Sequence, residues 1–280
     1  MQSEKAVKME ANMKLGSLVA ATVLALLPAT ALAQQESALD KIKKSGVIKA
    51  CIAQLAPESF KDAKTGEWHG VTIDLLTELA KWMKVKFEPV EVKWDIAVLA
   101  LKRGDCDMFG GSFVFNAPRA MEVNYIYPFY KKGVNFIVSK SGKQSFAAPE
   151  DFNNPRATIA VVAGSGDHET ARRMFPKANI LALSVNSNIQ LIESVRRGDA
   201  DAAYMSTFTV RWWLAIPENA AWAKIAFPGQ DLFSSPNGWA VRYGDPDWKA
   251  FLDGFSQWAV SSGTVQALYD TYFDRTNPFK

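Results

Sequence analysis

Short apolar runs alternate along this chain with segments whose apolar residues recur every three to four positions. Runs at residues 47–53, 85–92 and 108–113 predict buried strands. The helix predicted between the first two runs, with Thr72 as its candidate N-cap, turns four apolar residues inward: Leu75, Leu76, Leu79 and Met83. Strands that alternate with helices favour an α/β fold with a parallel sheet.

One pattern occurs twice, about a hundred residues apart. Residues 94–119 read WDIAVLALKRGDCDMFGGSFVFNAPR, and residues 188–210 read NIQLIESVRRGDADAAYMSTFTV. In each copy an apolar helical stripe, with Ile96 and Leu99 in the first copy, ends at Arg-Gly before Asp-x-Asp and an apolar strand. The two copies predict two facing α/β lobes with ligand-binding loops after their strands. The alternative is ordinary helix-end chemistry that arose twice by chance.

The first thirty-three residues have the pattern of a secretory signal peptide. Lys14 precedes the apolar residues 15–27, and Ala31-Leu32-Ala33 forms a small-residue cleavage site before Gln34. Met13 is an alternative translation start, and an uncleaved anchor is the alternative to cleavage, although the apolar run is short for a membrane span. We therefore expect an exported, soluble protein that begins at Gln34.

The chain after residue 33 is nearly neutral. It holds 29 basic and 27 acidic residues without a basic tract. Nothing in this distribution indicates a nucleic-acid partner.

Both cysteines, Cys51 and Cys106, fall in predicted neighbouring strands, where export permits a disulfide. Two buried thiols are the alternative. Neither cysteine has metal-ligand spacing, and the chain lacks Gly-x-Ser-x-Gly and His-Glu-x-x-His motifs. We therefore expect no metal and no cofactor.

Two segments carry a family resemblance. Residues 70–75, Gly-Val-Thr-Ile-Asp-Leu, and the block from Gly104 to Tyr130, with Asn-Ala-Pro-Arg at 116–119 and Pro-Phe-Tyr at 128–130, occur at ordered spacings. They resemble the family 3 extracellular solute-binding proteins, the periplasmic receptors of polar amino acid ABC transporters. The similarity extends from about Leu39 to Phe273.

The resemblance implies an α/β, bilobed type II periplasmic-binding-protein fold, whose chain crosses twice between the lobes. Applied to this sequence, it predicts a signal peptide at 1–33, the first part of lobe one at 34–132, lobe two at 133–234 and a return to lobe one at 235–280. The crossings fall at 130–135 and 233–239.

Arg119 is the leading candidate for ligand binding, because a guanidinium can grip a carboxylate with two parallel hydrogen bonds. In similar proteins the matching arginine binds the α-carboxylate, whereas a structural ion pair is the alternative role. Gly164, Ser165 and Gly166 precede a predicted helix, where free amides and the Ser165 hydroxyl would share that carboxylate. Asp167 is interpreted as a helix cap.

Other site positions depart from the family pattern. The aspartate expected to hold an α-ammonium is replaced by Ser206, a stacking tyrosine by Leu55, and a hydrogen-bonding side chain by Val114. Glu58, in the first loop, either supplies the missing carboxylate or faces solvent. Two further residues at a strand end complete the predicted site: Ser112 and Phe113.

These observations favour a monomeric periplasmic receptor that closes on a small carboxylate and delivers it to the membrane permease of an ABC transporter. The alternatives are a cyclohexadienyl-dehydratase-like enzyme and an accessory protein of a periplasmic dehydrogenase. The dehydratases need a carboxyl acid in lobe two, but residues 206–209 contain none. The sequence leaves the ligand's identity open.

Overall fold

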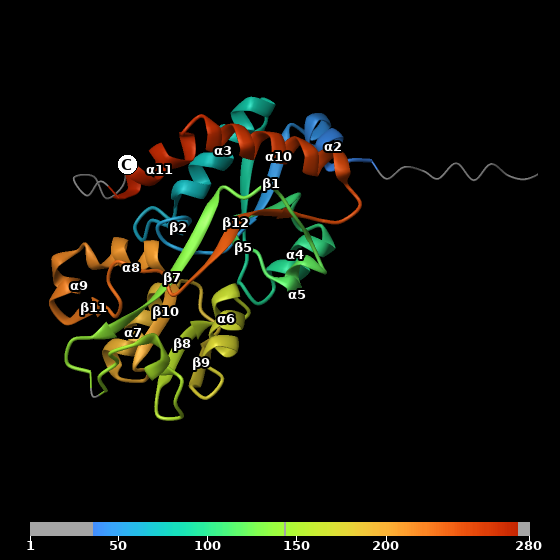
Figure 1. The fold of residues 1–280 in the computed structure, drawn as a ribbon. Coiled ribbons are helices and arrows are strands. Elements are labelled where there is room, and N and C mark those ends of the chain that lie inside the picture. Colours follow the sequence, from blue (N-terminus) through green and yellow to red (C-terminus); the bar gives the residue numbers. More distant parts are fainter. Residues whose placement is uncertain (1–35, 143, 274–280) are drawn as a thin grey trace, which may run out of the picture. The chain divides into compact units, whose positions relative to one another are not determined.

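The structure is a computed structural model that describes residues 36–142 and 144–273. The predicted signal peptide lies outside these residues. Ten strands form one sheet in the order β4-β1-β5-β12-β7-β10-β8-β9, with β6 on β12 and β11 on β7, and β2 pairs with β3 separately (Figure 1). The strands are β1 Val47–Ile52, β2 Phe60–Lys61, β3 Trp68–His69, β4 Lys86–Glu91, β5 Met108–Val114, β6 Asn124–Tyr125, β7 Tyr130–Ser139, β8 Thr158–Val162, β9 Asn179–Leu183, β10 Ala202–Ser206, β11 Ala223–Ile225 and β12 Phe233–Val241.

The sheet contains two parallel sections joined by an antiparallel pair. The strands β4, β1 and β5 are parallel, as are β10, β8 and β9. Between the sections, β12 pairs antiparallel with β7, from Phe233 opposite Val134 to Asn237 opposite Tyr130. This pair occupies the two segments where the chain was expected to cross. The division into lobes at 132/133 and 234/235 stays a prediction.

Helices cover both faces of each parallel section. In the first section, alternate residues of β1 pack with α3 or with α4, so Ile48 and Ala50 join one core and Cys51 joins another. In the second, α6 and α7 pack on β8 and β10. The helices are α2 Ala38–Ser45, α3 Val71–Met83, α4 Ala97–Arg103, α5 Ala117–Ala120, α6 Gly166–Met174, α7 Ile189–Arg197, α8 Thr207–Leu214, α9 Pro217–Trp222, α10 Pro246–Ser261 and α11 Thr264–Phe273, with a 3₁₀ turn, η2, at Pro149–Phe152.

The repeated Arg-Gly-Asp motif ends a helix in the same way in both copies. Gly104 and Gly198 have φ of 83° and 80°, the left-handed conformation that glycine adopts at low cost. The preceding arginine pairs with the aspartate two residues on, Arg103 with Asp105 and Arg197 with Asp199.

The second aspartate of each copy fixes the next strand to its neighbour. Asp107 Oδ2 accepts from the amide of Lys49, and Asp201 Oδ2 accepts from the amide of Thr158, both at 2.8 Å. The repeat is therefore a structural unit that aligns equivalent strands in the two sections.

Two local predictions were wrong. Ile96 and Leu99 are 43% and 52% exposed, because α4 begins at Ala97 and turns Ala97, Ala100 and Leu101 inward instead. Thr72 lies inside α3 rather than capping it.

The first turn of α3 is capped by backbone. The amide of Thr72 donates to the carbonyl of Glu58 at 2.9 Å. Gly70 has φ of 124°, and a Cβ there would lie 2.4 Å from the Glu58 oxygen, so only glycine allows this approach.

The predicted Cys51–Cys106 disulfide is confirmed, with Cα atoms 5.6 Å apart. It joins β1 to the residues just before β5 and so ties two adjacent strands of the first section. Among residues 36–142 and 144–273, no helix is both long enough and apolar enough to cross a membrane.

Candidate functional site

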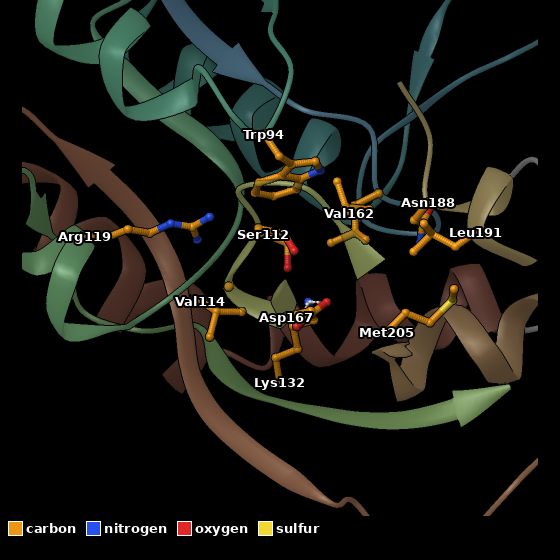
Figure 2. A pocket seen from close by; sticks show the side chains of 13 residues that line it. Trp94, Ser112, Val114, Arg119, Lys132, Val162, Asp167, Asn188, Leu191 and Met205 are labelled. Carbon is orange, nitrogen blue, oxygen red and sulfur yellow. Dashed lines mark hydrogen bonds and ion pairs between the residues drawn. The ribbon is translucent and has the colours of Figure 1, made fainter. Parts of the chain in front are cut away.

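A small cavity lies where strands of both parallel sections reach their carboxyl ends. Its walls include Ser112 and Val114 from β5, Val162 from β8 and Met205 from β10. Figure 2 shows these side chains around one space, with Trp94 closing one side of it. This is the position expected for a ligand site in an α/β sheet.

Arg119 brings a buried cation to this cavity. It lies on α5, whose N-cap Asn116 accepts from the Arg119 amide through Oδ1 at 2.9 Å, and the residue is 8% exposed. The guanidinium lies over the Phe113 ring, 4.3 Å from its centroid, and Nη2 donates to the carbonyl of Gly164 at 2.7 Å. Nη1 has no hydrogen-bond partner within the described structure. Burial lowers the pKa of Arg119, while Tyr125 and Asp167 oppose that shift.

The start of α6 lies beside Arg119 Nη1. A Cβ at Gly166 would lie 3.5 Å from Nη1, so the glycine leaves the space in front of the guanidinium open. Ser165 Oγ accepts from the His168 amide at 3.1 Å and keeps its own proton for donation. The Gly164 amide is engaged by His168 Nδ1, so the first-turn amides of Gly166 and Asp167 are the ones suited to an anion.

The other two charged residues of the cavity neutralise each other. Lys132 Nζ on β7 lies 3.0 Å from Asp167 Oδ2, and their side chains are 4% and 13% exposed. Arg119 forms no ion pair with any residue in the described part of the chain. The lining therefore carries one uncompensated positive charge.

Glu58 is buried next to this charge cluster but is not part of the cavity wall. Its Oε1 lies 3.5 Å from Tyr130 Oη, and Oε2 has no partner among the described residues. Burial raises the pKa of Glu58 to about 7; Lys132 lowers it and Asp167 raises it further.

Ser112 connects the cavity to the antiparallel strands β7 and β12. Its Oγ accepts from Asn237 Nδ2 of β12 at 2.9 Å and lies 3.0 Å from Tyr130 Oη of β7. The wall of the site is thus hydrogen-bonded to both strands at which the chain was expected to cross.

The structure brings four of the predicted site residues to the cavity: Arg119, Ser112, Ser165 and Gly166. The other four lie behind or beside it. Gly164 and Phe113 contact the guanidinium of Arg119, Glu58 is buried near Lys132, and Ser206 is buried with no partner for Oγ in the described residues. The roles of all eight in ligand binding stay predictions.

Sequence reasoning missed Lys132 and Asn188. It considered Asp167 only as the cap of α6, but Ser165 is the N-cap residue and Asp167 pairs with Lys132. A signal for Asn188 was available: Trp94 and Asn188 each precede the glycine of their repeat by ten residues, and both line the cavity. Lys132 carried no such signal, because a lysine in a crossing strand is ordinarily exposed.

Comparison with known proteins adds independent evidence. The chain matches the sequence profile of the Bacterial extracellular solute-binding proteins, family 3, over residues 47–275. A cyclohexadienyl dehydratase of Pseudomonas aeruginosa is 27% identical over 253 residues, which cover 90% of this chain and 91% of that protein. A probable histidine-binding protein of Neisseria gonorrhoeae is 22% identical over 221 residues, 79% of this chain and 80% of that protein.

Solved structures agree on the fold. An ancestral amino acid-binding protein, described as a precursor of cyclohexadienyl dehydratase, has a TM-score of 0.76 at 28% identity, over 85% of this chain and 100% of that one. A putative ABC transporter binding component of Wolinella succinogenes, complexed with lysine, has a TM-score of 0.74 at 24% identity, over 82% and 97%. The predicted bilobed α/β fold is confirmed, and the chain belongs to the family 3 bacterial extracellular solute-binding proteins.

Proposed function

We propose that this protein is an exported receptor that captures a small carboxylate without a free α-ammonium and presents it to the permease of an ABC transporter. The observation that carries this proposal is the buried, uncompensated charge of Arg119, whose Nη1 has no partner among the described residues. A buried guanidinium is costly unless an anion satisfies it, and a carboxylate matches its geometry. The hydroxyl of Ser165 and the first amides of α6 add donors on the same side.

A site for zwitterionic amino acids needs a free carboxylate to pair with the ligand's ammonium group. The wall of this cavity, among the residues that the structure describes, has none. Asp167 is the acidic residue of that wall, and Lys132 engages it. The family position for the ammonium-binding aspartate holds Ser206. An α-ammonium buried here would keep its charge unpaired, at a cost of several kcal/mol. Relatives described as binding histidine or amino acids therefore do not determine the ligand of this chain.

The cavity is small, about 20 Å³, which is room for roughly one water molecule. A carboxylate would need the two sides of the site to separate before it enters and to close around it afterwards. Such closure supplies affinity without a covalent step, and it gives a transporter a distinct liganded form to recognise.

Calorimetric titration of a carboxylate panel and of the common amino acids tests the proposal. We expect the tightest ligands among acids without a free α-ammonium. Arg119→Ala should weaken them by about 3 kcal/mol, roughly a hundredfold, and Arg119→Lys, which keeps the charge without the two-pronged geometry, should recover part of that loss. Ser206→Asp should shift the preference toward amino acids. Tight binding of an unmodified amino acid by the wild type and by Glu58→Gln would contradict the ligand class.

A second candidate function is dehydration of a cyclohexadienyl acid, favoured by the Pseudomonas aeruginosa relative and by the buried carboxyl of Glu58. A proton could pass from Glu58 through Tyr130 to Ser112, which lines the cavity. The Glu58–Tyr130 contact is long, however, at 3.5 Å, and the segment 206–209 offers no acid. Incubation with prephenate or arogenate should yield no product above the uncatalysed rate, since general acid catalysis contributes ~10²-fold or more. Turnover that Glu58→Gln removes would instead establish the enzyme.

A further inference from the structure

Asn188 occupies a helix start without capping the helix. It is the N-cap residue of α7, a position where the side-chain oxygen of asparagine ordinarily accepts from an amide of the first turn. Here it makes no such bond, and the side chain, in a residue only 2% exposed, lines the cavity instead (Figure 2). The side-chain amide of Asn188 therefore does not stabilise the start of α7.

Two neighbours fix which end of that amide group faces Thr209. Thr209 Oγ1 lies 2.6 Å from the carbonyl oxygen of Ala56 and 3.1 Å from the nitrogen of Asn188. A carbonyl only accepts, so the single hydroxyl proton of Thr209 is used on Ala56. Thr209 Oγ1 is then an acceptor toward Asn188, which must present Nδ2 to it. The orientation of the amide follows from the chemistry of the three groups.

The remaining atom, Asn188 Oδ1, is a buried acceptor with no partner among the described residues. Arg119 Nη1 is likewise a buried donor without a partner among these residues, and Arg119 and Asn188 line the same cavity. The site thus offers a cationic donor from α5 and, from the start of α7, an uncharged acceptor. A ligand that satisfies both has a carboxylate and a separate donor.

We propose that Asn188 Oδ1 is a ligand-binding acceptor that selects carboxylates bearing a neutral hydrogen-bond donor, and that Thr209 is the positioning residue that aims it. This proposal rests on the carboxylate receptor function proposed above. An uncharged acceptor satisfies a hydroxyl or an amide N–H, but it cannot neutralise an ammonium. The ligand class narrows accordingly to hydroxy acids and acids with an acylated nitrogen.

The hydrogen bonds that orient the Asn188 amide also connect the two sides of the cavity. Thr209 lies on α8, directly after β10, whereas Ala56 follows β1 in the other parallel section, and the two residues are 0% and 5% exposed. Oδ1 is therefore held in its direction by a contact between segments on the two sides of the cavity. Loss of the Thr209 hydroxyl frees the amide to rotate, and the acceptor is no longer held in its direction in the closed site.

A series of four-carbon acids with a hydroxyl or amino group at different positions tests the role of Asn188. The probes are butyrate, its 2-, 3- and 4-hydroxy derivatives, and 2- and 4-aminobutyrate, each titrated by calorimetry. We expect wild-type protein to bind one hydroxybutyrate at least roughly tenfold more tightly than butyrate, because a site built around a hydroxyl penalises the acid that lacks it. The aminobutyrates should bind more weakly than that hydroxy acid.

Variants separate recognition from folding. In Asn188→Leu and in Thr209→Val the ratio between the preferred hydroxybutyrate and butyrate should fall to near one, whereas Thr209→Ser, which keeps the hydroxyl, should retain it. Asn188→Asp, which adds a charge at nearly constant shape, should raise affinity for an aminobutyrate. Each variant is first checked by its thermal unfolding and circular dichroism.

The possible failures are distinguishable. A hydroxyl preference that persists unchanged in Asn188→Leu or Thr209→Val overturns the assignment, as does equal binding of butyrate and all three hydroxy acids. Both results leave the carboxylate receptor intact if Arg119→Ala still weakens binding roughly a hundredfold. Failure of wild-type protein to bind any of the acids, butyrate included, counts against the receptor function itself.

Discussion

Glu58 should make this protein less stable as the pH rises from about 5 to 8. The residue is 1% exposed, and burial raises the pKa of its carboxyl to about 7 against 4.5 for an ordinary glutamate. The charge of Lys132 limits the rise, and that of Asp167 adds to it. The folded protein therefore holds a proton on Glu58 at a pH where the unfolded chain has released it.

The sign and size of the effect follow from this difference. Stability from the protonated carboxyl is fully present below pH 4.5, declines as the pH rises toward 7, and is lost above that value. A rise in pKa from 4.5 to about 7 corresponds to about 3 kcal/mol of unfolding free energy. Because the group is fully buried, solvent screening does not reduce this figure appreciably.

Urea unfolding of wild-type protein and Glu58→Gln at pH 5, 6, 7 and 8 measures the contribution of Glu58 to the free energy of unfolding. Glutamine resembles the protonated acid, so the variant should be more stable than the wild type by about 1 kcal/mol or less at pH 5 and by about 3 kcal/mol at pH 8. Glu150→Gln, at an exposed position, is the matched control and should follow the wild type. If Glu58→Gln has the same pH profile as the wild type, the carboxyl is ionised in the folded protein and the reasoning fails.

Three further results are expected. Replacing Cys51 and Cys106 by alanine should lower the unfolding free energy by about 4 kcal/mol, the chain-entropy value for a loop of this length, and a loss below about 1 kcal/mol would show that the bridge does not stabilise the fold. Gly166→Ala should weaken carboxylate binding roughly tenfold because its methyl group enters the space before Arg119, whereas Gly254→Ala, which meets nothing within 4 Å, should bind normally. Amino-terminal sequencing of exported protein should begin at Gln34, and an intact Met1 would refute cleavage.

The sequence predicted those features that depend on the chain's own local chemistry. The glycines at 104 and 198 end their helices as expected, because a left-handed residue after an arginine-ended helix leaves little alternative. The disulfide was predictable from two cysteines in adjacent strands and an exported context. The parallel sections followed from the alternation of strands and helices.

Features that depend on contacts between distant segments could not be predicted from the sequence. The sequence pattern predicts that Ile96 and Leu99 point into the core. Nothing in the sequence shows that α4 starts at Ala97 and packs through Ala97, Ala100 and Leu101 instead. Thr72 resembled a cap, but the carbonyl of Glu58 from the preceding loop occupies that role. Lys132 is buried because Asp167, thirty-five residues later, accepts from it.

The two copies of the repeat place equivalent residues at or beside the site, so differences between the copies determine what each end of a ligand meets. Ser112 and Ser206 each follow the helix-ending glycine by eight residues. Ser112 is hydrogen-bonded to β7 and β12, whereas Ser206 Oγ has no partner among the described residues. The uncompensated cation, Arg119, belongs to the first copy, while the second contributes the neutral amide of Asn188. This asymmetry orients the ligand: we expect its carboxylate beside the first copy and its uncharged donor beside the second.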